Sequence, residues 1–332
     1  MNYQYRLSVI VPCYNVEPHL DLSLSCLEKQ WDDESLEFIF INDCSSDGTL
    51  DKLEAFRNRH PSNTVIINKT VNEGVSTARN DGLQMARGEW VTFFDSDDAL
   101  AENTYKSLCE NYLDDKVNIL SFKTNIIWSS SKFNHPVHVN GDVEWEGDGR
   151  EFFKKFLTNV TWIFIYKHDL IQRLGASFRR LTFLEDTLFN FEVFLNEGVY
   201  VRRVDSKSHY YIMHTGSLSN VETPGRQQRM ADDMMQVLQI MQNKKQTLDD
   251  GELVDRVVWK QRDIALRFVP LFMRCESLDL SAVRNIRRQL FAWGVYPYSG
   301  ISGGTKRIMN DILFRFPRLL RLSRPLLLRL SR

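Results

Sequence analysis

The stretch that decides the fold is Trp90-Val91-Thr92-Phe93-Phe94-Asp95-Ser96-Asp97-Asp98. Its first five residues are all aromatic or β-branched, which is typical of a strand buried on both faces of a sheet. Three carboxylates follow, and clustered carboxylates are costly unless a divalent cation or a basic ligand neutralises them. Carboxylate oxygens favour Mg²⁺ or Mn²⁺ held together with substrate phosphates. The alternative is an Asp-rich turn in which Asp97 or Asp98 caps a helix beginning at Ala99.

Three more strands are expected before this stretch, at residues 7–11, 38–41 and 65–67, and each is followed by a helical pattern. Such alternation predicts a parallel sheet with right-handed crossovers. Ligands bind outside the carboxyl ends of parallel strands. We therefore expect one cleft to collect the polar residues that follow the four strands, namely Asn15, Asp43, Asn72 and Asp95.

The usual phosphate-binding loops are absent from the sequence. No GxGxxG follows the first strand, and GxxxxGK[ST] occurs nowhere. Dinucleotide binding and P-loop hydrolysis both depend on those loops. Any nucleotide must be held in another way.

Four motifs follow the predicted strands, namely Val9-Ile10-Val11-Pro12-Cys13-Tyr14-Asn15, Asn42-Asp43-Cys44-Ser45-Ser46-Asp47-Gly48-Thr49, Asn72-Glu73-Gly74-Val75-Ser76-Thr77-Ala78-Arg79-Asn80-Asp81-Gly82 and Phe93-Phe94-Asp95-Ser96-Asp97-Asp98. In this order they closely resemble the motifs of the family 2 glycosyltransferases. The resemblance covers about residues 5–115 and continues more weakly to about residue 220. It implies an α/β fold of GT-A (Rossmann-like) type, with a mixed, mostly parallel sheet flanked by helices and followed by a helical C-terminal region.

The resemblance also implies a donor site. Pro12 and Tyr14 would line the base pocket, and Asp43 would hydrogen-bond the base. Arg79 would reach the base or the phosphates, Asp95 would hold the ribose, and Asp97 would ligate a Mn²⁺ or Mg²⁺ ion that bridges the diphosphate. The implied nucleotide-sugar-binding set is Pro12, Tyr14, Asn15, Asp43, Asn72, Arg79, Asp95 and Ser96.

Two of these residues have simpler explanations. Asp43 could cap the helix that follows the second strand through an Asx turn, since Asn and Asp dominate such turns. Arg79 could lie on a solvated helix face, where most arginines are found. Both alternatives stay open from the sequence.

A second chemical site is expected at Phe183-Leu184-Glu185-Asp186-Thr187-Leu188-Phe189-Asn190. It resembles the family's Glu-Asp pair, which starts the acceptor-side helix and carries the catalytic base. Apolar neighbours would desolvate a carboxylate there and raise its pKa towards the working range of a base. We assign Asp186 as the base, with Glu185 beside it for acceptor binding or orientation. The alternative is a pair of first-turn acids favoured by the helix dipole.

A third element runs from Tyr210 to Ser219. Related enzymes have a Tyr-rich strand here, followed by a Ser-x-Ser loop that can close over the diphosphate. His214 lies between the two and is a candidate contact to phosphate or metal. A single histidine at a strand end can equally be structural or solvated.

The charge is unevenly distributed. Residues 305–332 hold eight Lys or Arg and one Asp, net +7, whereas residues 1–304 hold 34 basic and 42 acidic residues, net −8. The acidic body argues against nucleic acid as a partner. Apolar residues and arginines in the tail are typical of an interfacial membrane helix, although the tail could instead pack on the body or on a second subunit of a homo-oligomer. We expect a catalytic domain at 1–220, a helical subdomain at 221–300 and a basic amphipathic tail at 301–332.

The five cysteines form no CxxC pair and read as buried reduced thiols. The apolar stretch at residues 7–11 is too short for a signal-peptide core, and no apolar run approaches the ~20 residues of a spanning helix. These features predict a cytoplasmic protein, with the tail as a peripheral contact to the inner face of the membrane.

The expected activity is that of an inverting, metal-dependent glycosyltransferase. It would move a sugar from a nucleotide diphosphate sugar, most simply a UDP-sugar, to a hydroxyl of a glycan or lipid-linked oligosaccharide in bacterial surface-polysaccharide synthesis. Two alternatives remain: a sugar nucleotidyltransferase on a similar sheet, and a non-catalytic glycan or membrane-surface module with a relict cleft. The retained carboxylates argue against the last, because a binding module needs no base.

Overall fold

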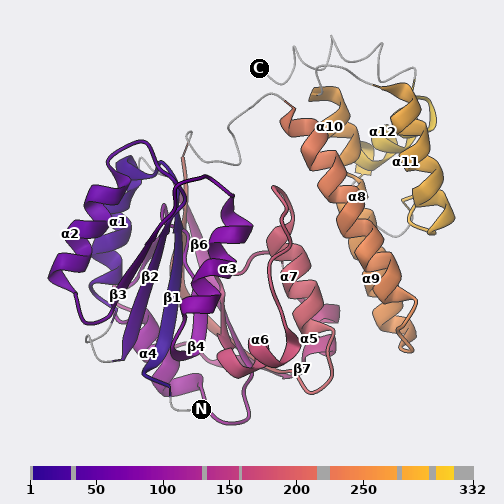
Figure 1. Cartoon of the computed structure of the whole chain (residues 1–332). Coiled ribbons are helices and arrows are strands. Elements are labelled where there is room, and N and C mark those ends of the chain that lie inside the picture. The colour runs from indigo at the N-terminus through magenta and orange to yellow at the C-terminus, as the bar shows by residue number, and fades with distance from the viewer. Residues whose placement is uncertain are drawn as a thin grey trace. The chain divides into compact units, whose positions relative to one another are not determined.

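The computed structural model describes residues 3–30, 35–128, 133–156, 159–214, 225–274, 279–298 and 304–317. The chain forms two compact units (Figure 1). The first contains Met1–Leu181 and Glu185–Val221, and the second contains Thr182–Leu184 and Glu222–Arg332.

The parallel half of the sheet is the one the sequence predicts. Its four strands run in the order β3-β2-β1-β4, and every neighbouring pair is parallel. The carboxyl ends therefore meet at one edge, as expected from the βα alternation. The strands are β1 (Tyr5–Cys13), β2 (Leu36–Asn42), β3 (Thr64–Asn68) and β4 (Gly88–Phe93).

The other half of the sheet is mixed. Strand β8 lies antiparallel between β4 and β6, whereas β9 runs parallel to β6 and antiparallel to β5 and β7. The fold expected from the resemblance, a mixed and mostly parallel sheet with helices, is confirmed in its layout. These strands are β5 (Ala99–Leu100), β6 (Ile119–Trp128), β7 (Val143–Asp148), β8 (Phe164–Lys167) and β9 (Tyr200–Met213).

The helix considered from Ala99 onward does not exist. Ala99 pairs with Tyr210 in the sheet, and helix α4 (Thr104–Tyr112) begins only after Asn103, whose φ is 59°. Ala99 and Leu100 are fully buried, so pairing with β9 satisfies backbone groups that a solvated turn would leave to water. Asp97 and Asp98 are thus not helix caps.

Helices cover both faces of the sheet. Helices α1 (Glu17–Leu27) and α2 (Thr49–Arg59) lie side by side on one face, with α3 (Val75–Met85) on the other (Figure 1). Helix α3 approaches the sheet closely at Gly82, where a Cβ would lie 2.4 Å from Ile10 Cγ2. This approach holds Arg79, one helical turn earlier, at the edge of the sheet. Three further helices complete the unit: α5 (Gly149–Lys155), α6 (His168–Leu174) and α7 (Glu185–Phe194).

The second unit is helical, as expected. Its middle part forms two successive helices, α9 (Gly251–Ala265) and α10 (Phe268–Arg274). Pro270 explains the break, because proline has no N–H and its ring clashes with the carbonyl four residues earlier. The remaining helices are α8 (Arg226–Lys245), α11 (Leu280–Ala292) and α12 (Gly304–Arg315).

Four cysteines lie in the described residues and all are free thiols. Cys13, Cys26 and Cys109 are buried as predicted, but Cys44 is partly exposed. Cys275 lies outside the described residues. None of the helices in the described parts of the chain combines the length and the apolar composition that crossing a membrane requires.

Candidate active site

The ends of β1 and β2 are joined by side-chain to backbone hydrogen bonds. Asn15 has a φ of 48°, and its Oδ1 accepts from the backbone N of Ser46 at 2.8 Å. The Asn15 amide therefore fixes the loop after β2. Pro12 and Tyr14 flank it and are partly exposed, whereas Asn72 is fully on the surface.

Asp43 is buried at the end of β2 and orients the loop before α3. Its Oδ2 accepts from Gly74 N at 2.7 Å, and its Oδ1 accepts from Glu73 N at 3.1 Å. Lys69 Nζ lies 3.1 Å from the same Oδ1. The capping alternative was therefore assigned to the wrong helix, since Asp43 anchors the entry to the third helix and not the second. The sequence analysis missed Lys69, because its contact with Asp43 joins residues that are far apart in the sequence.

The three aspartates after β4 differ in their burial and in their contacts. Asp98 is fully buried, accepts from Ile212 N at 2.9 Å and lies 3.3 Å from His209, so it anchors strand β9. Asp97 lies with its Oδ2 2.8 Å from Nε2 of His214. Ser96 is buried and its carbonyl accepts from a side chain of α1. Only Asp95 and Asp97 keep side chains that are about a quarter exposed.

The residues at Asp97 fit a divalent ion that takes most of its ligands from a substrate. Asp97 lies beside His214, the candidate contact to phosphate or metal, and the ring of His19 packs against His214 at a tilt of 31° with centroids 3.9 Å apart. Among the described residues, no group of three His, Cys, Asp or Glu side chains could enclose an ion by itself. Mg²⁺ is commonly bound by one or two carboxylates plus phosphates rather than by an all-protein cage. This donor set therefore suits an ion shared with a diphosphate.

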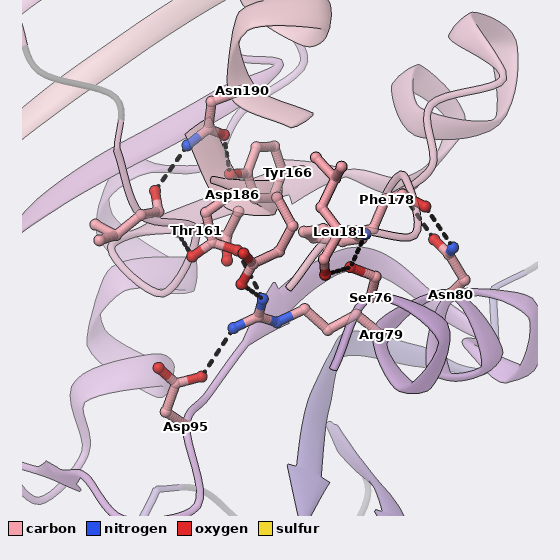
Figure 2. A network of polar contacts seen from close by, with 12 residues as sticks. Ser76, Arg79, Asn80, Asp95, Thr161, Tyr166, Phe178, Leu181, Asp186 and Asn190 are labelled. Carbon is pink, nitrogen blue, oxygen red and sulfur yellow. Dashed lines mark hydrogen bonds and ion pairs between the residues drawn. The ribbon is translucent and has the colours of Figure 1, made fainter. Parts of the chain in front are cut away.

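Arg79 links the start of helix α7 to the aspartates that follow strand β4. Its Nη1 donates to Asp186 Oδ1 at 2.7 Å and to Glu185 Oε1 at 3.1 Å, and its Nη2 donates to Asp95 Oδ1 at 3.1 Å (Figure 2). Only 3% of Arg79 is exposed, so the solvated-face alternative is wrong. The guanidinium is engaged by carboxylates here, and its expected contact with the base or phosphates stays a prediction.

Asp186 lies in the first turn of α7 and is held from two sides. Its Oδ1 faces Arg79, and its Oδ2 accepts from Thr161 N at 3.2 Å. Burial raises the pKa of Asp186 to about 7, and the negative charges of Glu185 and Asp95 act in the same direction against the opposing effect of Arg79. A carboxylate with such a pKa can exchange a proton near neutral pH. An ordinary solvated first-turn acid would not show this burial.

The sequence analysis missed the residues behind Asp186. Asn190 and Tyr166 are both fully buried and hydrogen-bond each other (Figure 2). The sequence held one signal for Asn190: it follows Asp186 by four residues, and the residues between them are apolar apart from Thr187. Residues four apart share a helix face. The Ser-x-Ser loop at Ser217 and Ser219 lies outside the described residues.

Comparison with known proteins identifies the family. The family model described as "Glycosyl transferase family 2" matches residues 8–175. The chain belongs to this family. Among relatives in glycosyl transferase family 2, the uncharacterized glycosyltransferase YibD of Escherichia coli (strain K12) is 26% identical over 235 residues, covering 68% of this chain and 66% of the relative.

Another relative is the poly(ribitol-phosphate) beta-N-acetylglucosaminyltransferase TarS of Staphylococcus aureus (strain MW2), 29% identical over 219 residues, covering 62% of this chain and 35% of TarS. The chain thus spans less than two thirds of the length of these curated relatives. The crystal structure of S. aureus TarS 1-349 in complex with UDP-GlcNAc superposes with a TM-score of 0.63 at 20% identity, covering 93% of this chain and 91% of that one. This likeness confirms the expected fold class.

Proposed function

We propose that this protein is an inverting glycosyltransferase that moves a sugar from a nucleotide diphosphate sugar to a hydroxyl group. The observation that carries the proposal is that the guanidinium of Arg79 contacts both the buried carboxylate of Asp186 and the carboxylate of Asp95. We therefore propose that Asp186 serves as the base for the acceptor, beside the strand edge that would bind the donor. Family membership supports the same reaction class.

The chain's own residues can carry out the proton transfer. The Asp186 carboxylate takes the proton of the acceptor hydroxyl while that oxygen attacks the anomeric carbon, and the diphosphate leaves from the opposite face. One base suffices for this displacement. Arg79 keeps the carboxylate in place and offsets the charge of Glu185 and Asp95. A Mn²⁺ or Mg²⁺ ion held by Asp97 and His214 would supply the Lewis acidity that stabilises the leaving diphosphate.

A UDP-sugar is the donor we propose, because the structural neighbour TarS was crystallised with UDP-GlcNAc. We propose that the nucleotide lies along Pro12, Tyr14 and Asp43, beside Asn15 and Asn72. The buried Asp43 carboxylate is already oriented by two backbone N–H groups, which lowers the entropy cost of using it for recognition. For the acceptor we propose a hydroxyl of a cell-surface glycan or lipid-linked oligosaccharide, in keeping with the poly(ribitol-phosphate) named for TarS.

The acceptor would meet the enzyme at the inner face of the membrane. Ile308, Ile312 and Phe316 are about half exposed and recur every four residues along α12 and just beyond it, so they share one face. Leu313 and Phe314 on the other side are buried. With the basic residues of 301–332, the exposed face suits an anionic lipid surface. We therefore propose a cytoplasmic protein, organised as 1–220, 221–300 and 301–332, with a peripheral membrane contact through 305–332.

The proposal is tested by incubating the protein with Mn²⁺ and UDP-GlcNAc, UDP-glucose or UDP-galactose in the presence of saccharide acceptors. We expect release of UDP with one donor and an acceptor-linked sugar whose anomeric configuration, read by NMR, is inverted. Retention of configuration would contradict the single-base mechanism. Incorporation of labelled pyrophosphate into UTP, with release of the sugar 1-phosphate from the UDP-sugar, would favour a nucleotidyltransferase, and absence of any turnover would favour a relict cleft.

A further inference from the structure

The peptide group between Val160 and Thr161 is bracketed by two side chains of α7. Thr161 N donates to Asp186 Oδ2 at 3.2 Å, and the Val160 carbonyl accepts from Asn190 Nδ2 at 2.7 Å (Figure 2). Both atoms belong to one planar unit, whose N–H and C=O point in opposite directions. Asp186 and Asn190 are four residues apart, so two side chains on one turn of the helix hydrogen-bond the N–H and the C=O of the same peptide group.

The orientation of Asn190 is settled by its partners. A carbonyl oxygen can only accept, so the nitrogen of the Asn190 side chain must face Val160. The Asn190 Oδ1 then faces the hydroxyl of Tyr166, which donates to it at 2.7 Å. Asn190 and Tyr166 are both fully buried. The side chain is therefore a fixed link between strand β8 and the 160–161 peptide.

We propose that Asn190 is a positioning residue that holds the base Asp186 through the Val160–Thr161 peptide. A donor on the carbonyl polarises the peptide and strengthens its N–H as a donor to the carboxylate, because chains of hydrogen bonds reinforce one another. Arg79 holds one carboxylate oxygen and the peptide holds the other, so together they set the plane of the carboxylate. This inference rests on the proposed function of Asp186 as the base.

The charged surroundings of Asp186 allow a selective test. Arg79 faces it from α3, Glu185 from its own helix and Asp95 from the end of β4, while the Tyr166 hydroxyl lies nearby on β8. Replacing Asn190 with the similarly sized leucine removes none of the charged groups, although it takes the acceptor from the Tyr166 hydroxyl, an effect that Tyr166→Phe controls for. A shift in the titration of Asp186 would then report the loss of the peptide contact.

The experiment compares Asn190→Leu with Asn63→Leu. Asn63 is also buried, and its Nδ2 donates to the Leu36 carbonyl at the start of β2, away from the base. For Asn190→Leu we expect kcat to fall about 10- to 100-fold, as for a misplaced catalytic group, with an unchanged KM for the nucleotide sugar. The acidic limb of the kcat profile should move up by about one pH unit. Asn63→Leu should lower stability and leave the limb in place.

A second readout does not need activity. The pH dependence of unfolding is compared between each variant and the same variant carrying Asp186→Asn, and the difference reports the titration of Asp186 in the folded state. We expect an upward shift in Asn190→Leu, and a smaller one in Tyr166→Phe, which keeps the Val160 contact and serves if Asn190→Leu does not fold. An unshifted titration, or equal losses of kcat in the Asn190 and Asn63 variants, would overturn the proposal. A wild type without transferase activity would instead contradict the proposed function, while the unfolding titration would still test the contact.

Discussion

Two aspartates of the site show how burial and partners set the use of one side chain. Asp97 lies at the sheet edge, its side chain is 29% exposed, and its carboxylate lies 2.8 Å from His214. Asp186 has a side chain 12% exposed, an ion pair with Arg79 and a backbone N–H on its second oxygen. An accessible carboxylate with few partners can bind an ion, whereas a desolvated carboxylate is suited to proton transfer.

The largest effect is expected from Asp186→Asn. The amide cannot accept the proton of the acceptor, so transfer should fall about 10²- to 10⁴-fold, the usual contribution of a general base. Affinity for UDP should stay within a factor of about two, because the proposal assigns Asp186 to the acceptor and places the nucleotide along Pro12, Tyr14 and Asp43. Initial rates and calorimetric titration with UDP on the same preparation check this. Loss of UDP affinity would mean that Asp186 serves the donor.

Arg79→Met should cost about 3 kcal/mol of unfolding free energy, since removing one partner of a buried ion pair leaves uncompensated charge. The guanidinium is 4% exposed and faces three carboxylates. Urea denaturation measures the loss. Arg180→Met is the control, because Arg180 is 69% exposed, and its loss should stay within about 0.5 kcal/mol. Equal losses in the two variants would show that the Arg79 network does not stabilise the fold.

The transfer rate and the stability should both depend on the protonation of Asp186. The pKa of Asp186 is raised from 3.8 to about 7, so the base form is lost below that pH, and kcat/KM should fall about tenfold per unit there. Stability should change in the opposite sense. The folded state holds this proton more tightly than the unfolded one, so the contribution of Asp186 to stability is present below about pH 4 and is lost as the pH rises to about 7. A pH-independent rate between pH 5 and 7 would contradict the assignment.

The smallest effect on stability is expected from His214→Gln. The His214 side chain is 6% exposed and packs against His19, so the replacement has to keep most of its volume. Its partner Asp97 is 29% exposed, and pairs with an exposed partner contribute only about 0 to 1 kcal/mol. Thermal unfolding without nucleotide should therefore change little, while the stabilisation by UDP and Mn²⁺ should decrease. A large loss of intrinsic stability would make His214 a structural residue, as the sequence left open.

The sequence predicts the parts of the site that are local in the chain. The alternation of strands and helices placed Asp43, Asp95 and Asp97 at one sheet edge, and the Glu-Asp pair opened a helix as expected. Contacts between distant segments could not be foreseen. Arg79 reaches Asp186 across 107 positions, and Thr161 reaches it across 25. The short strand β5 was missed because two residues carry no periodicity, and only pairing with β9 defines it.

One measurement tests the central claim that the strand edge binds a nucleotide diphosphate through a shared metal ion. Thermal unfolding is followed with UDP, GDP, CDP, dTDP and ADP, each with Mn²⁺ or with EDTA, for the wild type and Asp97→Ala. A ligand that binds only the folded state at a hundredfold excess over Kd stabilises it by about 2.7 kcal/mol. We predict stabilisation by UDP with Mn²⁺ that is lost with EDTA and in Asp97→Ala. No stabilisation by any nucleotide, or one unaffected by EDTA and by Asp97→Ala, would contradict the claim.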